Sequence, residues 1–115
     1  MPSYDFVDYD QLEGTVKKVR KALGATAFGV NFFDLPPNTE GHEHDESAGN
    51  QEEVYVYVRG SGVLRLDAEE VDVRAGQAVR IDPGVTRRPV SGDDGLAWVA
   101  IGAPVEGRYE PPSWG

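Results

Sequence analysis

Residues 42–62 read HEHDESAGNQEEVYVYVRGSG, and this stretch decides the fold assignment. Valine and tyrosine alternate from Val54 to Val58, a period of two that is typical of a β-strand with two different faces. A polar loop precedes this strand, and Gly60 and Gly62 follow it as residues that tolerate the backbone of a tight turn. The stretch therefore predicts a loop, a strand and a turn in that order.

Strand patterns of this kind recur along much of the chain and are separated by Pro, Gly, Asn and Asp. They cover residues 27–35, 53–59, 62–66, 70–74, 77–81, 87–90 and 96–101. Short strands at this spacing, with turn residues between them, are typical of an antiparallel barrel or sandwich. The sequence therefore predicts an all-β protein with seven short strands.

The length of the chain, 115 residues, predicts one domain over residues 1–115, with a core at about 27–102. Residues 1–26 and 103–115 are expected to pack outside this core, with Trp114 docked on the barrel or on a partner subunit. Residues 12–23 fit either a short helix or an edge strand. Because so small a domain buries a limited share of its surface, we also expect a homodimer.

Acidic residues outnumber basic ones by 20 to 11, which gives a formal charge of −9. This charge repels phosphate backbones and anionic lipids, so we expect neither nucleic acid nor a membrane as partner. The chain has no cysteine, which excludes disulfides, thiolate metal sites and thiol nucleophiles. Residues 1–10 carry three aspartates and no apolar run, so we expect no signal peptide and a cytoplasmic protein.

The two histidines of the chain, His42 and His44, are one residue apart. In an extended segment this spacing places both imidazoles on one face, where they can chelate a divalent metal. The alternative is a solvated polar loop that holds no ligand. The spacing taken alone leaves both interpretations open.

The sequence around these histidines resembles the first conserved motif of the cupin superfamily, G-x5-H-x-H-x(3,4)-E-x6-G. His42, His44, Glu53 and Gly60 stand at its histidine, glutamate and final glycine positions. The resemblance implies a single antiparallel cupin barrel, the architecture also described as a jelly roll or double-stranded β-helix.

The second cupin motif, G-x5-P-x-G-x2-H-x3-N, is matched only in part by the sequence from Gly76 onward. Both of its glycines are present, as Gly76 and Gly84, but Asp82 replaces its proline. Arg87 stands where the family usually has the histidine that completes a metal site. In the first motif, the loop at 45–52 is longer than the family spacing, and we expect it to offer a ligand or a lid.

The resemblance implies a divalent metal site with the ligands His42, His44 and Glu53. Gln51, two residues before Glu53 on the same strand face, is expected as a substitute ligand. Glu46, from the enlarged loop, is the alternative to Gln51. A guanidinium stays protonated and cannot coordinate a metal, so Arg87 removes one ligand of the family's set. Two histidines and a carboxylate still suit Fe, Mn, Zn or Ni, with positions left open for a substrate.

Arg87 has two expected roles. If its side chain points into the pocket, it binds a carboxylate or phosphate of the ligand. If it pairs with Glu53, it forms a structural ion pair that opposes metal binding. Tyr55 and Tyr57 share a strand face with Glu53, and they either line the pocket as ligand-binding residues or pack in the core.

Two functions follow from the resemblance. The first is a metal-dependent enzyme that acts on a small anionic organic molecule by isomerisation, decarboxylation or oxygen insertion. The second is a non-catalytic, metal-free barrel that binds a small molecule, which the missing histidine favours. No nucleophile motif or phosphate loop is present, so no catalytic residue is assigned.

Overall fold

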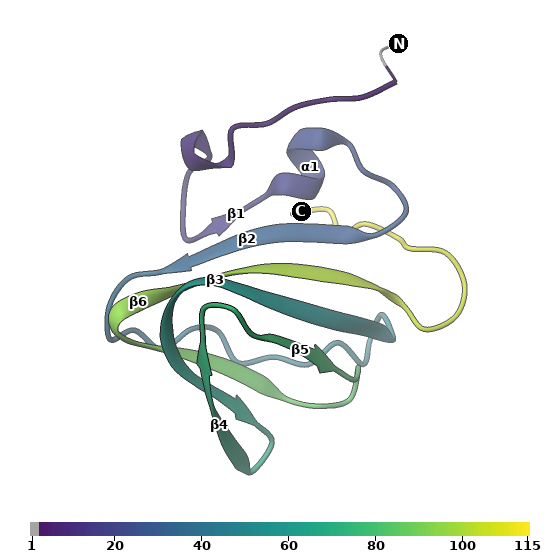
Figure 1. The fold of residues 1–115 in the computed structure, drawn as a ribbon. Coiled ribbons are helices and arrows are strands. Elements are labelled where there is room, and N and C mark those ends of the chain that lie inside the picture. Colours follow the sequence, from purple (N-terminus) through teal and green to yellow (C-terminus); the bar gives the residue numbers. More distant parts are fainter. Residues whose placement is uncertain (1–2) are drawn as a thin grey trace.

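The computed structural model describes residues 3–115, which fold around one antiparallel β-sheet (Figure 1). The elements are η1 (Tyr9–Gln11), β1 (Val16–Lys17), α1 (Val19–Leu23), β2 (Gly29–Leu35), β3 (Gln51–Leu66), β4 (Glu69–Arg74), β5 (Ala78–Ile81) and β6 (Arg87–Pro104). The strands follow the order β1-β2-β6-β3-β4, and β5 pairs with β3 as well. The expected all-β class is confirmed.

The prediction of seven short strands is wrong in one respect. Segments 53–59 and 62–66 belong to the single strand β3, and segments 87–90 and 96–101 belong to the single strand β6. The two strands pair with register shifts between Tyr57 and Arg59 and between Gly60 and Gly62. The residues expected to end these strands bend them instead, because a bulge interrupts the pairing locally, lets the sheet change direction, and lets the pairing resume beyond it.

The bend depends on glycines that bring the two long strands unusually close together. Gly60 has a φ of +79°, and a Cβ atom placed there would overlap the carbonyl oxygen of Gly95 in β6. Because of the bulge, the inward face of β3 changes from odd to even positions. Tyr55 and Tyr57 point inward before the bend, and Leu64 points inward after it.

Inward side chains from β2 to β6 form one hydrophobic core. Its buried members are Leu35, Tyr55, Tyr57, Leu64, Val73, Ile81, Leu96, Trp98 and Ala100. The outer face of the first half of β3 carries Val56 and Val58, which are 37% and 48% exposed. The alternation expected for residues 54–58 is therefore present, with the tyrosines inside and the valines outside.

Both alternatives for residues 12–23 are realised in part. Val16 and Lys17 form an edge strand on β2, and α1 follows directly. Gly24 ends α1 in the left-handed conformation, with a φ of +72°. A short helix and an edge strand therefore share this segment. None of the helices within residues 3–115 is both long and apolar enough to span a membrane.

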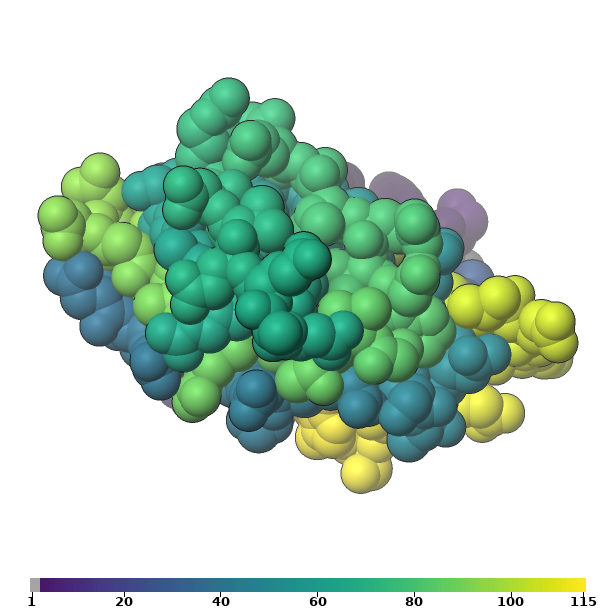
Figure 2. Space-filling view, turned by 90° about the horizontal axis from the view of Figure 1, so that it is seen from below, coloured from purple at the N-terminus to yellow at the C-terminus, as the bar shows by residue number. Residues whose placement is uncertain are grey.

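The C-terminal segment, residues 105–115, returns to this N-terminal layer, and its end lies beside α1 and β2 (Figure 1). The Arg20 guanidinium donates a hydrogen bond from Nε to the carbonyl oxygen of Gly115 at 2.6 Å. The same segment, yellow in Figure 2, protrudes at one side of the barrel when the molecule is viewed from below. Residues 105–115 are called the C-terminal arm below.

Replacing Gly60 by alanine tests the close contact at the bend. Gly60→Ala adds a Cβ against the Gly95 carbonyl at a positive φ, and we expect it to lower the free energy of unfolding by ~2 kcal/mol or more. Gly84→Ala is the matched control, because a Cβ there meets no atom within 4 Å. Urea unfolding of both variants measures the difference. Equal stability of the two would contradict the account of the bend.

Candidate metal centre

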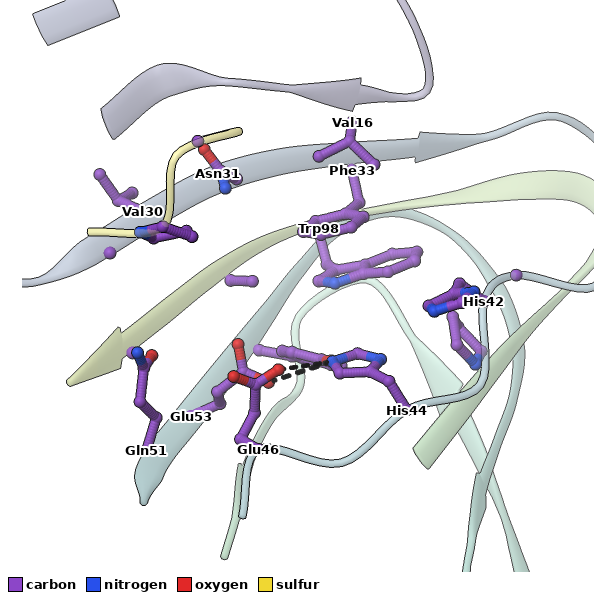
Figure 3. Close-up of a pocket in the computed structure, with 18 of the residues that line it drawn as sticks. Val16, Val30, Asn31, Phe33, His42, His44, Glu46, Gln51, Glu53 and Trp98 are labelled. Carbon is purple, nitrogen blue, oxygen red and sulfur yellow. Dashed lines mark hydrogen bonds and ion pairs between the residues drawn. The ribbon is translucent and has the colours of Figure 1, made fainter. Parts of the chain in front are cut away.

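A cavity of about 1010 Å³ lies between the inner face of the sheet and the C-terminal arm. Its two sides differ in chemistry (Figure 3). Val16, Phe33 and Trp98 lie on one side, whereas His44, Glu46 and Glu53 gather on the other. The cavity therefore has an apolar wall that faces a cluster of metal-ligating side chains.

Backbone hydrogen bonds to β6 and to the turn before it hold the loop that carries the histidines. The N–H of His44 donates to the carbonyl of Arg87 at 3.0 Å, and the N–H of Arg87 donates to the carbonyl of His44 at 2.8 Å. The Glu46 N–H donates to the Pro83 carbonyl at 2.9 Å. These bonds fix the backbone at both residues, so their side chains enter the cavity from defined positions.

Glu53 comes from the inward face of β3, at the end of the strand away from the bend. It pairs with Gly102 of β6 on one side and with Ile81 of β5 on the other. Its carboxylate is surrounded on three sides by polar groups. Oε1 lies 3.9 Å from Nε2 of His44, 3.4 Å from Nη1 of Arg87 and 3.5 Å from the Tyr55 hydroxyl, which donates to it.

His44 is the centre of the cluster. Its Nε2 lies 3.0 Å from Oε2 of Glu46 and 3.9 Å from Oε1 of Glu53. One ligand atom from each of these three residues lies within 4.8 Å of the others. One imidazole and two carboxylates thus converge on a single point at the polar side of the cavity (Figure 3).

This donor set fits a divalent metal. Metal–ligand bonds are ~2.1 Å long, and the angle between two of them ranges from the octahedral to the tetrahedral value. Neighbouring ligand atoms are therefore ~3.0–3.4 Å apart. The His44–Glu46 distance of 3.0 Å lies within that interval, and the His44–Glu53 distance of 3.9 Å is slightly longer. Imidazole nitrogen and carboxylate oxygen are ligands of Fe, Mn, Zn and Ni alike, so the donors do not select among these metals.

The structure does not place His42 in the three-residue cluster. Its ring stacks on that of His44, with centroids 5.8 Å apart and an interplanar angle of 18°. Both rings line the cavity, but only His44 presents a nitrogen to Glu46 and Glu53. The two histidines therefore lie close together, as expected. Only His44, however, belongs to the three-residue group of possible metal ligands.

Gln51 and the two tyrosines occupy three different environments. Gln51 lines the cavity two residues before Glu53, farther along β3 from His44 (Figure 3). Tyr55 is buried, lines the cavity and donates to Glu53. Tyr57 is equally buried but lines a separate, smaller hollow beneath β4 and β5. Within residues 3–115, only the first two of these residues therefore adjoin the metal-ligating side.

Arg87 lies behind the cavity wall. Its side chain is fully buried, and it is absent from the described residues that line the cavity. Nη2 donates to the Asp82 carbonyl at 2.9 Å, and Nη1 faces Glu53 at 3.4 Å. Of the two roles expected for Arg87, the geometry matches the ion pair with Glu53. Contact with a ligand would require its side chain to move into the cavity.

The two carboxylates strongly favour a protonated His44. The close carboxylate of Glu46, and after it that of Glu53, raises the pKa of His44 from 6.5 to about 9, although burial acts in the opposite direction. Burial, reinforced by the charge of Glu53, raises the pKa of Tyr55 well above 10, so that its hydroxyl keeps its proton. A metal at this site must therefore displace a proton from His44.

In the sequence, only the unusual length of the loop between His44 and Glu53 indicated Glu46. It was predicted there as an alternative metal ligand to Gln51. Asn31, Phe33 and Trp98 also line the cavity, and none of them was predicted from the sequence as a site residue. Their strand alternation places them inside the barrel, but alternation does not show which inward residues pack in the core and which face a cavity.

This fold and site define a small all-β barrel with metal-ligating side chains on one side of an internal cavity. The chain belongs to the cupin family, because the family model Cupin_2, described as the cupin domain, matches residues 31–102. The matched residues extend from β2 to β6 and include the whole cluster. The resemblance inferred from the two motifs is confirmed. A comparison with curated proteins gave no match.

Solved structures share the fold at low sequence identity. A cupin protein from Bacteroides fragilis has a TM-score of 0.80 at 21% identity, over 97% of this chain and 93% of that one. A Cupin 2 conserved barrel domain protein from Salinispora arenicola gives 0.68 at 17%, over 89% and 88%. KdgF from a Halomonas species gives 0.67 at 13%, over 87% and 90%. At these identities the likeness establishes the fold alone.

We predict that His44 of the metal-free protein titrates near pH 9, because Glu46 and Glu53 stabilise its protonated ring. Since the folded-state pKa exceeds the unfolded value of 6.5, this pairing stabilises the fold fully below pH 6.5 and is lost as the pH rises through about 9. NMR of the imidazole carbon-bound protons, recorded with a chelator present, measures the midpoint. Glu46→Gln should move it toward 6.5. A wild-type midpoint near 6.5 would refute the geometry of the cluster.

Proposed function

We propose that this cupin binds a divalent metal through His44, Glu46 and Glu53, and a small organic molecule in the adjoining cavity. The observation that carries this proposal is the convergence of one imidazole and two carboxylates on the wall of a large cavity. A cavity of about 1010 Å³ is at the upper end of the volumes usual for small-molecule sites. His42 and Gln51 line the same cavity but lie outside this three-residue group.

When bound, the metal supplies a Lewis acid that polarises a carbonyl group of the ligand. The residues around it perform the remaining tasks. Tyr55 keeps its proton and orients Glu53 through its hydroxyl. Arg87 anchors the same carboxylate from behind and limits its movement. A solved structure from Thermotoga maritima described as a predicted oxalate decarboxylase, 23% identical with a TM-score of 0.59, makes a decarboxylase the enzyme class to assay first.

Metal-free ligand binding is the second candidate function, and the charges of the cluster favour it. Protonated His44 and Arg87 together balance the two carboxylates of Glu46 and Glu53 without any metal. Buried ion pairs need this local compensation, because an unpaired buried charge is costly. The same fold would then hold a small molecule and catalyse no reaction.

An anionic ligand was expected because an inward-pointing Arg87, one of its two expected roles, would bind a carboxylate or phosphate. The buried position of Arg87 removes that argument, so the proposal keeps a small organic ligand and no longer depends on its negative charge.

The expected homodimer stays a prediction. The exposed outer valines Val56 and Val58, beside Ile101 of β6, offer a surface for it, and sedimentation velocity measures the outcome.

Elemental analysis of protein purified without an affinity tag tests the metal proposal. We expect near-stoichiometric metal, before or after incubation with Fe(II), Mn, Zn or Ni. His44→Ala should weaken binding by at least ~100-fold, since it removes a ligand rather than an outer partner.

His42→Ala is the matched control. It removes the stacked ring but leaves the cluster intact, and it should retain most of the metal. Equal loss in both variants would contradict the assignment of ligands. If the wild-type protein binds no metal under any of these conditions, metal-free ligand binding is the function that remains.

A further inference from the structure

Arg87 is a buried cation beside the metal-ligating cluster. Its side chain is fully buried, and its one ion pair within residues 3–115 is with Glu53. Nη2 donates to the backbone carbonyl of Asp82, whereas Nε and Nη1 have no hydrogen-bond partner among the described residues. A buried charge is costly unless a group of opposite charge lies close to it. Glu53 therefore stabilises Arg87 in the metal-free protein.

A metal in the cluster would need the same carboxylate. Oε1 of Glu53 lies 3.4 Å from Nη1 of Arg87 and 3.9 Å from Nε2 of His44. A carboxylate that binds a metal offers less negative charge to a neighbouring cation, because the ion attracts the same electron pairs. The Asp82 carbonyl, 2.9 Å from Nη2, and the backbone pairing with His44 hold Arg87 in this position. The metal and Arg87 therefore compete for one carboxylate.

A site that holds a metal would also carry excess positive charge. The carboxylates of Glu46 and Glu53 balance a divalent ion by themselves, so the guanidinium of Arg87 adds one positive charge that they do not balance. The side chains of Arg87 and Glu53 are only 0% and 15% exposed, and salt screens such buried charges weakly. Arg87 therefore raises the free energy of the metal-bound site relative to the metal-free site.

We propose that Arg87 competes with the metal for Glu53, so that Arg87 weakens metal binding and makes the ion exchangeable. This inference rests on the metal site proposed above, and it concerns how strongly the site holds the ion. A purely structural role predicts the opposite result. If Arg87 only positioned Glu53 for the metal, its removal would weaken binding, so the sign of the change in affinity separates the two roles.

Arg87→Met tests the proposal, because methionine is an uncharged, flexible side chain that fits a buried position. Competition with a chelating dye measures the Zn²⁺ affinity of each protein. We expect Arg87→Met to bind Zn²⁺ at least ~10-fold more tightly than the wild type and to release it more slowly to excess chelator. Arg87→Lys keeps a positive charge and should gain less affinity than Arg87→Met.

Arg88→Met is the matched control. Arg88 is the neighbouring residue in β6, but its guanidinium contacts the Gly41 carbonyl and Glu40 and does not contact the cluster. It should therefore bind Zn²⁺ within ~3-fold of the wild type, because its charge is partly exposed and solvent screens it. A second control adds His44→Ala to Arg87→Met, and loss of the gain shows that the ion binds in the cluster.

Removal of Arg87 leaves Glu53 without its partner, so the metal-free Arg87→Met protein should unfold at a lower temperature than the wild type. Zn²⁺ should then raise the unfolding temperature of Arg87→Met more than that of the wild type, since tighter binding stabilises the folded state more. If Arg87→Met does not fold, Arg87→Gln takes its place, because glutamine removes the charge but keeps a donor for the Asp82 carbonyl.

Equal or weaker Zn²⁺ binding in the uncharged variants would overturn this proposal and leave the metal site intact. An equal gain in Arg87→Lys and Arg87→Met would also overturn it, because charge would then not be the cause. Zn²⁺ binding by the uncharged variants alone would support it, since Arg87 would then exclude the ion. No Zn²⁺ binding by the wild type or by any variant would overturn the metal site and this proposal together.

Discussion

Strands β3 and β6 pair from Gln51–Pro104 at one end to Leu66–Arg87 at the other, and they bend together where Gly60 meets Gly95. Every other strand is attached to this pair, with β1 joined through β2. The bend turns the two halves of each strand toward a common interior, so that Glu53 from one end of β3 meets Arg87 from the opposite end of β6. The site exists because the two paired strands change direction at their register shifts and resume pairing beyond them.

Charge balance within the cluster would oppose the binding of a metal. Arg87 and a protonated His44 neutralise Glu46 and Glu53 in the metal-free protein. A metal has to replace the proton on His44, and the guanidinium next to Glu53 opposes the new positive charge. The family's usual histidine at this position would add a ligand, whereas arginine adds a competing cation. The acidic cavity lining compensates for this cation in part.

The sequence predicted the fold well because its signals were local. Alternation in residues 54–58 and the turn residues identified the strands, and the two motifs identified the family. The bend was read as two turns, because a glycine at a bulge and a glycine in a loop look alike in sequence. His44 and Glu53 were identified from the motif spacing. The burial of Arg87, and the grouping of Glu46 rather than His42 with His44 and Glu53, depend on side-chain direction in three dimensions, which spacing does not encode.

The central claim is that His44, Glu46 and Glu53 hold one metal ion. Anomalous diffraction from crystals grown with Co²⁺ or Zn²⁺, recorded above and below the absorption edge, tests it most directly. The account predicts one strong anomalous peak ~2.1 Å from Nε2 of His44 and from a carboxylate oxygen of each glutamate. A peak bound elsewhere, or fully soaked crystals in which the His44–Glu46 and Arg87–Glu53 pairs persist with no peak between them, would contradict it.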